Sequence, residues 1–455
     1  MEHFMGVITK HDSDDFFASF SLVDNIVSIL PHNDSARETC RRLQYNDLSD
    51  DNDSWMYGYS GNHTIAFLRR GTVPPTVSRL GTINFYTPII VKETKSSNNE
   101  NGKDKFKIIE FVGGIIDILY PPQMAFKQEK NMYILKDIND FTKSFTVNVN
   151  GESFVLKFSI NVRVNQEIGQ IPDFNDTHST ISFIFEKEKE FSEIEKYYSY
   201  ALKLCQFCCG RINVGFDINL HNGRTSYITV FKDQFNDYAN ENLYITEVIN
   251  LNELCDDVIK LFKIIIECKT QPYLLFLPKS NEEYRFINYT NVTDMCISID
   301  REYRLLGLTV DADYETIEKI LNDIPNYLKE SNEYDDESIN RVKGLLGNLK
   351  NPSSKMMITQ LYKEFYNCVE RITNTGIEDE LRSIKLYSIE EFSKKAAKFV
   401  DIRNKAAHKG VVWNDGIDIF HHLKLLIYLS VLKRASISKE KSTRMLNRLF
   451  YRYFM

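Results

Sequence analysis

The chain has 455 residues, of which 43% are hydrophobic and 26% charged, and its formal net charge is −7. These values are typical of a globular protein with two or three domains and a sizeable buried core. No apolar run reaches the roughly 18 residues of a membrane span, and the residues after Met1 lack the basic and apolar regions of a signal peptide. We therefore expect no membrane association and a cytoplasmic location.

Residues 1–185 are predicted to be β-rich, because short runs of β-branched and aromatic residues alternate there with Gly, Asn and Pro. Asn150-Gly151, between two such runs, predicts a hairpin turn. The polar stretch 95–105 predicts a loop. This alternation favours a sandwich or barrel-like domain. The strand-like runs are residues 81–86, 106–112, 115–120, 145–149, 154–164 and 181–185.

Residues 186–289 show a mixed pattern, which we assign to the same N-terminal module. The helical periodicity of residues 191–209 stops at Gly210, a residue favoured just beyond a helix. Residues 212–218 and 225–231 are strand-like, and residues 250–268 predict an amphipathic helix.

Residues 290–455 predict an antiparallel helical bundle, since amphipathic segments alternate with short links. The fold class is therefore α+β, with a β-rich N-terminus and an all-α C-terminus. The expected helices cover residues 292–306, 313–330, 337–349, 355–374, 389–409, 416–435 and 438–453.

The eight cysteines indicate reduced thiols, because most lie on apolar helical faces. Cys205, Cys208 and Cys209 supply half of a zinc-binding pattern without a second pair at metal spacing. Packing on a helix is the favoured interpretation of these three. We expect neither a metal nor a cofactor.

Charge is distributed unevenly along the chain. Residues 385–455 hold 15 Lys or Arg and six Asp or Glu, a net charge of +9, so the first 384 residues carry −16. A basic segment on an acidic chain favours a local polyanion site. The alternative is an ordinary solvated helical face.

The string Arg403-Asn404-Lys405-Ala406-Ala407-His408, followed by Lys409, lies at the end of the predicted helix 389–409. Arginine has a planar donor fork suited to phosphate, and histidine titrates near neutrality. Asn404 and His408 share one helix face, whereas Arg403 lies about 140° around the axis from His408. Lys405 and Lys409 are weaker candidates for contacts with RNA.

This string resembles the R-polar-x-x-x-H signature of HEPN domains, many of which are metal-independent ribonucleases. The β-rich start, Gly81-Thr82-Ile83 and the residues 111–114 are similar to the ApeA-type bacterial anti-phage HEPN proteins. The resemblance implies an endoribonuclease toxin of an antiviral, abortive-infection system, acting on RNA such as tRNA. It also implies a homodimer, or a higher even oligomer, in which two motif helices form a composite site. The N-terminal region would then sense a phage-derived trigger.

In this interpretation Arg403 binds the scissile phosphate, Asn404 orients His408 or contacts phosphate, and His408 transfers protons. Asp300 and Glu302 are candidates to orient Arg403 or His408, although helix-surface charge is favoured for both. His421-His422 is not expected to bind a metal, because adjacent residues point to different faces.

Two alternative functions stay open. One is a non-catalytic bundle that dimerises or binds nucleotide. In that case Arg403 would pair with an acidic residue such as Asp401, and His408 would cap the helix. The other is a ligand-binding β-module carried on a helical oligomeriser.

Overall fold

The computed structural model divides the chain into two compact units, Met1–Glu267 and Cys268–Met455. The finer division of the chain into three parts, with boundaries after residues 185 and 289, stays a prediction. The structure describes residues 2–10, 16–23, 26–38, 53–60, 63–70, 76–77, 82–87, 89–95, 105–129, 132–162, 176–223, 225–231, 247–268, 272–278, 287–309, 314–331, 333–347, 351–373, 385–409 and 417–450.

The first unit is built on a sheet of 14 strands, ordered β12-β13-β14-β9-β15-β16-β8-β5-β4-β1-β2-β3-β7-β6, and β10 and β11 form a separate pair. Every pairing is antiparallel. The strands are β1 Glu2–Lys10, β2 Phe16–Val23, β3 Ile26–Pro31, β4 Asp53–Ser60, β5 His63–Arg70, β6 Thr76–Val77, β7 Ile83–Tyr86, β8 Ile89–Lys95, β9 Lys105–Val112, β10 Phe126–Glu129, β11 Met132–Leu135, β12 Lys143–Val149, β13 Glu152–Asn161, β14 His178–Glu190, β15 Asp217–Asn222 and β16 Thr225–Phe231.

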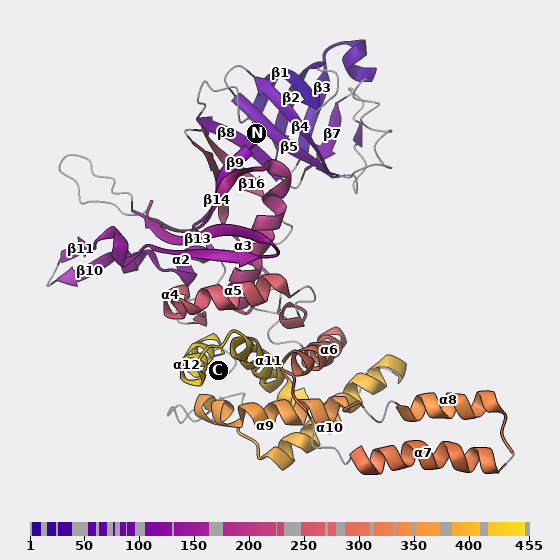
Figure 1. Ribbon diagram of the computed structural model, residues 1–455. Coiled ribbons are helices and arrows are strands. Elements are labelled where there is room, and N and C mark those ends of the chain that lie inside the picture. The colour runs from indigo at the N-terminus through magenta and orange to yellow at the C-terminus, as the bar shows by residue number, and fades with distance from the viewer. Residues whose placement is uncertain are drawn as a thin grey trace. The chain divides into compact units, whose positions relative to one another are not determined.

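Helices pack against one end of this sheet, which is formed by strands β12, β13, β14 and β9 (Figure 1). Alternate residues of β14 and β9 supply an aromatic core, in which the rings of Phe111 and Phe183 meet edge to face at 5.3 Å. Phe154 and Phe262 extend this core, with ring centroids 6.3 Å apart. The helices are α2 Ile115–Leu119, α3 Ile194–Cys209, α4 Leu251–Leu254 and α5 Asp257–Glu267, with short 3-10 turns at Pro122–Ala125, Ile138–Asp140 and Phe191–Glu193.

Two local predictions for this unit are confirmed. Helix α3 ends at Gly210, which adopts the left-handed conformation with φ 68° and donates its N–H to Gln206 and Phe207. The β12–β13 hairpin turns through Asn150 and Gly151, both with positive φ. Residues that tolerate positive φ are those favoured at such turns.

Two other predictions are wrong. The predicted strand 115–120 is instead helix α2, Ile115–Leu119, with Tyr120 as its C-cap. The turn before it packs against the backbone of the segment leading into β15, since a side chain on Gly114 would meet the Gly215 carbonyl oxygen at 2.3 Å. The segment 250–268 is two helices, α4 and α5, because Cys255 takes a positive φ of 47° between them.

The second unit is a helical bundle, so the α+β class is confirmed. Helix α11 is buried along nearly its whole length among α6, α9 and α12. Tyr362 of α9 stacks on Phe392 of α10 at a centroid distance of 3.7 Å. The helices are α6 Tyr289–Leu305, α7 Tyr314–Glu330, α8 Asp336–Gly347, α9 Ser354–Thr373, α10 Ile389–Lys409, α11 Phe420–Arg434 and α12 Lys439–Leu449, with 3-10 turns at Pro272–Leu274 and Ile417–Ile419.

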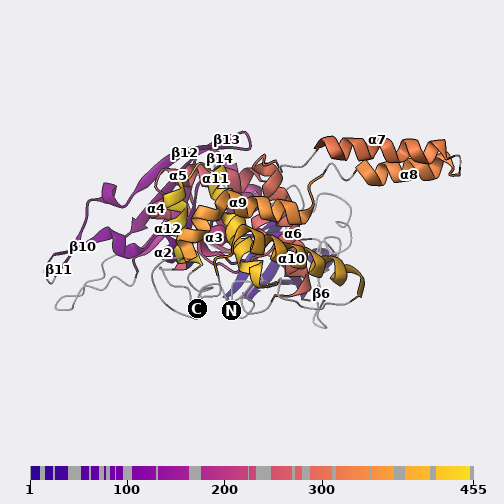
Figure 2. The ribbon, with the colours of Figure 1, turned by 90° about the horizontal axis from the view of Figure 1, so that it is seen from below.

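Helices α7 and α8 pack extensively only against each other and form an arm that leaves the bundle (Figures 1 and 2). Across the described parts of both units, no helix is long and apolar enough to cross a membrane.

Candidate functional site

Helix α10 carries the motif, and its limits match the predicted helix 389–409. Its first turn is closed by a capping box. Ser388 accepts from the Glu391 N–H at 3.2 Å, and Glu391 accepts from the Ser388 N–H at 3.0 Å. Phe392, Phe399 and Ile402 are buried, so one face of α10 is fixed to the bundle while the opposite face stays in solvent.

The motif occupies the last two turns of α10, which project from the bundle (Figures 1 and 2). Arg403, Asn404 and Lys405 are all exposed. The Arg403 Nη1 atom donates to the Asn404 side-chain oxygen at 3.3 Å. Burial raises the pKa of the Cys296 thiol on α6 to about 11, and the charge of Arg403 opposes that rise. The guanidinium group is therefore near α6.

The backbone is helical through His408 and Lys409, so Asn404 and His408 keep their i,i+4 relation. The side chains of His408 and Lys409, and Gly410, lie outside the described residues. The structure thus brings Arg403 and Asn404 into contact.

Asp401 pairs with Lys405 at 2.6 Å. In the structure Asp401 thus has Lys405 as its partner. Lys405 holds an ion pair of the exposed i,i+4 type, which is weak and exchanges readily with water. The Lys405 ammonium group can therefore exchange Asp401 for a phosphate at a small cost in free energy.

Asp300 and Glu302 both pair with arginines outside the motif, and neither contacts Arg403. Asp300 pairs with Arg304 one turn along α6, at 3.1 Å. Glu302 is fully buried and receives two hydrogen bonds from Arg434 of α11, at 2.8 and 3.1 Å. Burial raises the Glu302 pKa, and the Arg434 charge opposes the rise. The sequence spacing gave no sign of this link between α6 and α11.

A polar cluster joins the start of α10 to the start of α11. Asp418 accepts hydrogen bonds from Tyr387, at 2.9 Å, and from Lys395. The Lys395 ammonium also lies 5.0 Å from the Tyr387 ring centroid. His422 donates its Nε2 proton to the Lys385 carbonyl oxygen, at an N–O distance of 2.7 Å. Sequence reasoning missed this cluster, which holds α10 in place rather than facing solvent.

His422 and the neighbouring Lys424 are buried, and His421 beside them is half-buried. Desolvation lowers the pKa of His421 to about 3 and that of His422 to about 4. It lowers the pKa of Lys424, which is 4% exposed, to about 7. Neutral, enclosed imidazoles are poor general acids, so neither histidine is a candidate to replace His408.

Cys205, Cys208 and Cys209 are buried free thiols on α3. Burial raises the pKa of all three thiols, so the thiolate form that a metal requires is disfavoured. Among the described side chains, no group of three potential ligands is placed to hold a metal ion.

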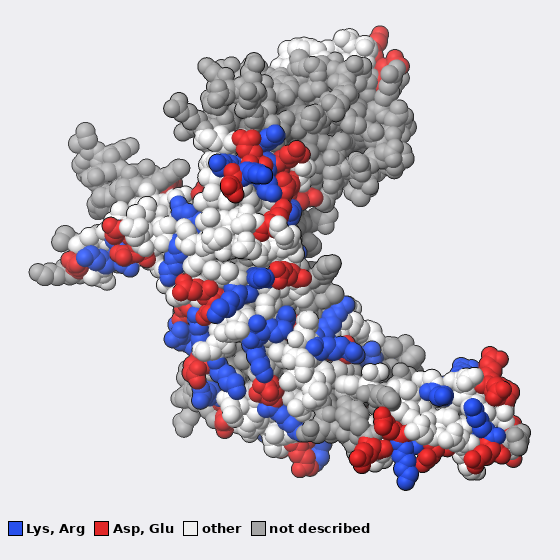
Figure 3. Space-filling view, viewed as in Figure 1, with Lys and Arg blue, Asp and Glu red and all other residues white. Residues whose placement is uncertain are grey.

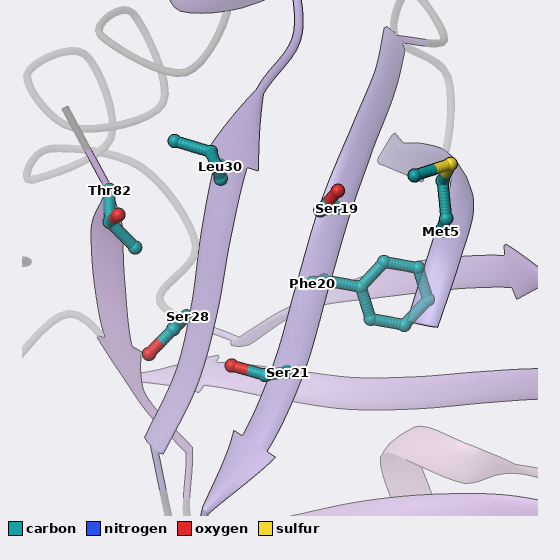
Figure 4. Close-up of a pocket in the computed structure, with 7 residues that line it drawn as sticks. All are labelled: Met5, Ser19, Phe20, Ser21, Ser28, Leu30 and Thr82. Atoms are coloured by element: carbon teal, nitrogen blue, oxygen red, sulfur yellow. The ribbon is translucent and has the colours of Figure 1, made fainter. Parts of the chain in front are cut away.

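The N-terminal sheet has a shallow pocket of about 430 Å³ on β1, β2 and β3 (Figure 4). Ser21 and Ser28 are paired across β2 and β3, and Met5 and Leu30 are exposed beside them. The lining carries hydroxyl and apolar groups and no charge, so it suits a neutral partner. It is lined by Met5, Ser19, Phe20, Ser21, Ser28, Leu30 and Thr82.

Comparison of the chain with protein-family models, curated proteins and solved structures found no match. The functional assignment therefore depends on the residues of the motif and their surroundings.

Proposed function

We propose that this protein is a metal-independent endoribonuclease whose site is formed by the ends of two α10 helices. The observation that carries the proposal is the placement of Arg403 and Asn404, exposed and in contact, on a projecting helix end with His408 one turn beyond Asn404. The surrounding basic segment, with its net charge of +9, suits an RNA backbone.

In the proposed reaction the RNA 2′-hydroxyl attacks the adjacent phosphorus atom and the bond to the 5′-oxygen breaks. A histidine accepts the proton of the 2′-hydroxyl, and a histidine donates a proton to the leaving 5′-oxygen. The products are a 2′,3′-cyclic phosphate and a 5′-hydroxyl. Arg403 neutralises charge that develops on the phosphate oxygens. DNA lacks the nucleophile and should resist.

A second chain is part of this proposal. Arg403 and His408 point in directions about 140° apart on one helix, so a single α10 does not bring the two groups together. A homodimer would bring Arg403 of one chain towards His408 of the other. His408 near the negative end of the helix dipole would be favoured as imidazolium.

The test is cleavage of total tRNA and mRNA by the full-length protein in EDTA. We expect His408→Ala and Arg403→Ala each to abolish cleavage, while Lys394→Ala, an exposed lysine on the same helix, stays active. Full activity of His408→Ala would disprove the assignment. Mixing the two inactive chains should restore part of the activity if one composite site needs each group once.

We further propose that the protein acts in abortive infection, with the N-terminal unit sensing a phage-derived trigger. The uncharged pocket on β1–β3 supports a protein or other neutral trigger. The fragment 268–455, checked for folding by circular dichroism, should be more toxic to a bacterial host than the full chain. Toxicity that survives His408→Ala would contradict inhibition of the nuclease by the N-terminal unit. A folded fragment no more toxic than the full chain would contradict it as well.

One observation favours a non-catalytic alternative. Lys405 and Arg403 already have intramolecular partners, Asp401 and Asn404, as expected of a helix that serves only for dimerisation. Self-association without RNA cleavage would favour this alternative.

A further inference from the structure

The α7–α8 arm has more apolar surface than its two helices cover. Leu321 and Leu328 are half-buried on one face of α7, and Ile339 of α8 is buried. Ile324 and Tyr327 lie at the edge of the same stripe and are 38% and 72% exposed. An isolated helical hairpin gains stability when such an edge is covered.

The arm is also acidic, most of all at its tip. Residues 314–347 hold eight Asp or Glu and four Lys or Arg, a net charge of −4. Five of the eight carboxylates lie within residues 330–337, a stretch without a basic residue, and Figure 3 shows carboxylates concentrated on the arm. Tyr334, 52% exposed, lies among them. This negative charge disfavours RNA as the partner that covers the apolar edge of the arm.

Helix α12 offers the complementary surface. Ser442, Met445, Leu446 and Leu449 are buried against the bundle. Lys441, Arg444 and Arg448 follow at i, i+3 and i+7 and so share the outer face. This basic stripe covers about two turns of helix.

We propose that the arm of one chain docks on the basic outer face of α12 in a second copy of the chain. In a two-fold dimer this contact forms twice, arm to α12 in both directions. The carboxylates at the tip meet Lys441, Arg444 and Arg448, while Ile324 and Tyr327 supply apolar contact along the arm. Within one chain, α12 packs on α9 and α11. The docking goes beyond the composite site at α10 and does not require RNA cleavage.

The experiment is a charge swap in the full-length protein, followed by sedimentation velocity. One variant reverses the tip by Glu333→Lys, Asp336→Lys and Glu337→Lys. It keeps Asp335, whose carboxylate accepts the Ser338 N–H at 2.7 Å at the start of α8. The other reverses α12 by Lys441→Glu, Arg444→Glu and Arg448→Glu. Each variant alone should self-associate at least tenfold more weakly, because the docked surfaces then carry like charges.

An equimolar mixture of the two variants should recover self-association, and so should one chain carrying all six changes. The matched control reverses exposed carboxylates of the first unit, Glu129→Lys, Asp140→Lys and Glu188→Lys, and should associate as wild type. Reversals without effect, or no recovery in the mixture, would overturn the proposal.

A photo-cross-linker at position 327 provides an independent measurement, with half of the chains labelled with ¹⁵N. Mixed-isotope cross-links into residues 439–449 are expected. Cross-links only within one chain, or only to other regions, would overturn the proposal. Loss of RNA binding in the α12 variant with self-association unchanged would assign α12 to RNA instead. Because the readout is self-association, failure here leaves the RNA-cleavage test of α10 unaffected.

Discussion

Helices α10 and α11 both carry basic and histidine side chains, but they place them in opposite environments. The end of α10 exposes Arg403 and Lys405, whereas α11 buries His422 and Lys424. Desolvation lowers the pKa of both buried groups. Residue type alone therefore does not identify a phosphate-binding group in this bundle, because burial decides which of these side chains stays charged at neutral pH.

The largest stability effect is expected at the buried pair that ties α11 to α6. Glu302→Ala removes the carboxylate that pairs with Arg434. The Arg434 side chain is only 14% exposed, so its charge would then be buried without this partner. We expect the free energy of unfolding in urea to fall by about 3–5 kcal/mol. The control is Asp401→Ala, which removes the exposed partner of Lys405 and should cost about 1 kcal/mol or less. Equal losses in the two variants would contradict the contrast between the helices.

Because of His422, the free energy of unfolding should depend on pH in the acid range. Its folded-state pKa of about 4 lies below the ordinary value of 6.5, so the unfolded chain binds the proton first as pH falls. Stability from this group is complete above about pH 7 and is lost as pH falls from about 6.5 to 4, by about 3 kcal/mol. His422→Gln keeps a donor for the Lys385 carbonyl and should reduce this loss in unfolding titrations. An unchanged pH profile would show that the ring is solvated.

Lys424 should oppose folding at neutral pH. Its pKa of about 7 lies below the ordinary 10.5, so stability rises with pH between about 7 and 10 as the unfolded chain loses its extra proton. Lys424→Met should stabilise the protein by about 2 kcal/mol at pH 7 and remove this slope. Thermal melts at pH 7 and 9 measure both effects. A destabilised variant would mean that contacts of the ammonium group, which lies 4.9 Å from the Phe420 ring centroid, outweigh the cost of its burial.

The smallest stability effect is expected at the motif. Arg403→Ala removes an exposed side chain whose one described hydrogen bond is to its neighbour Asn404. The melting temperature should not change measurably, although RNA cleavage should be lost. A clear drop in melting temperature would instead assign Arg403 a structural role against α6.

The sequence by itself determined the local features of this protein. The limits of α10 followed from its amphipathic period, and the ends of α3 and of the β12–β13 hairpin followed from Gly210 and Asn150-Gly151. The motif at residues 403–408 was also a sequence observation. Each of these depends on residues within one or two turns of each other, so neighbouring residues contain the needed information.

Tertiary structure decided which polar groups are available. Glu302 meets Arg434 across 132 residues, and the burial of His422 and Lys424 depends on helices distant in sequence. The isoleucine-rich run 115–119 forms a helix that packs on β14, and the turn before it lies against the backbone at Gly215. Charge and exposure are properties of the packed molecule, since desolvation by distant segments sets them and no local pattern records which segments will meet.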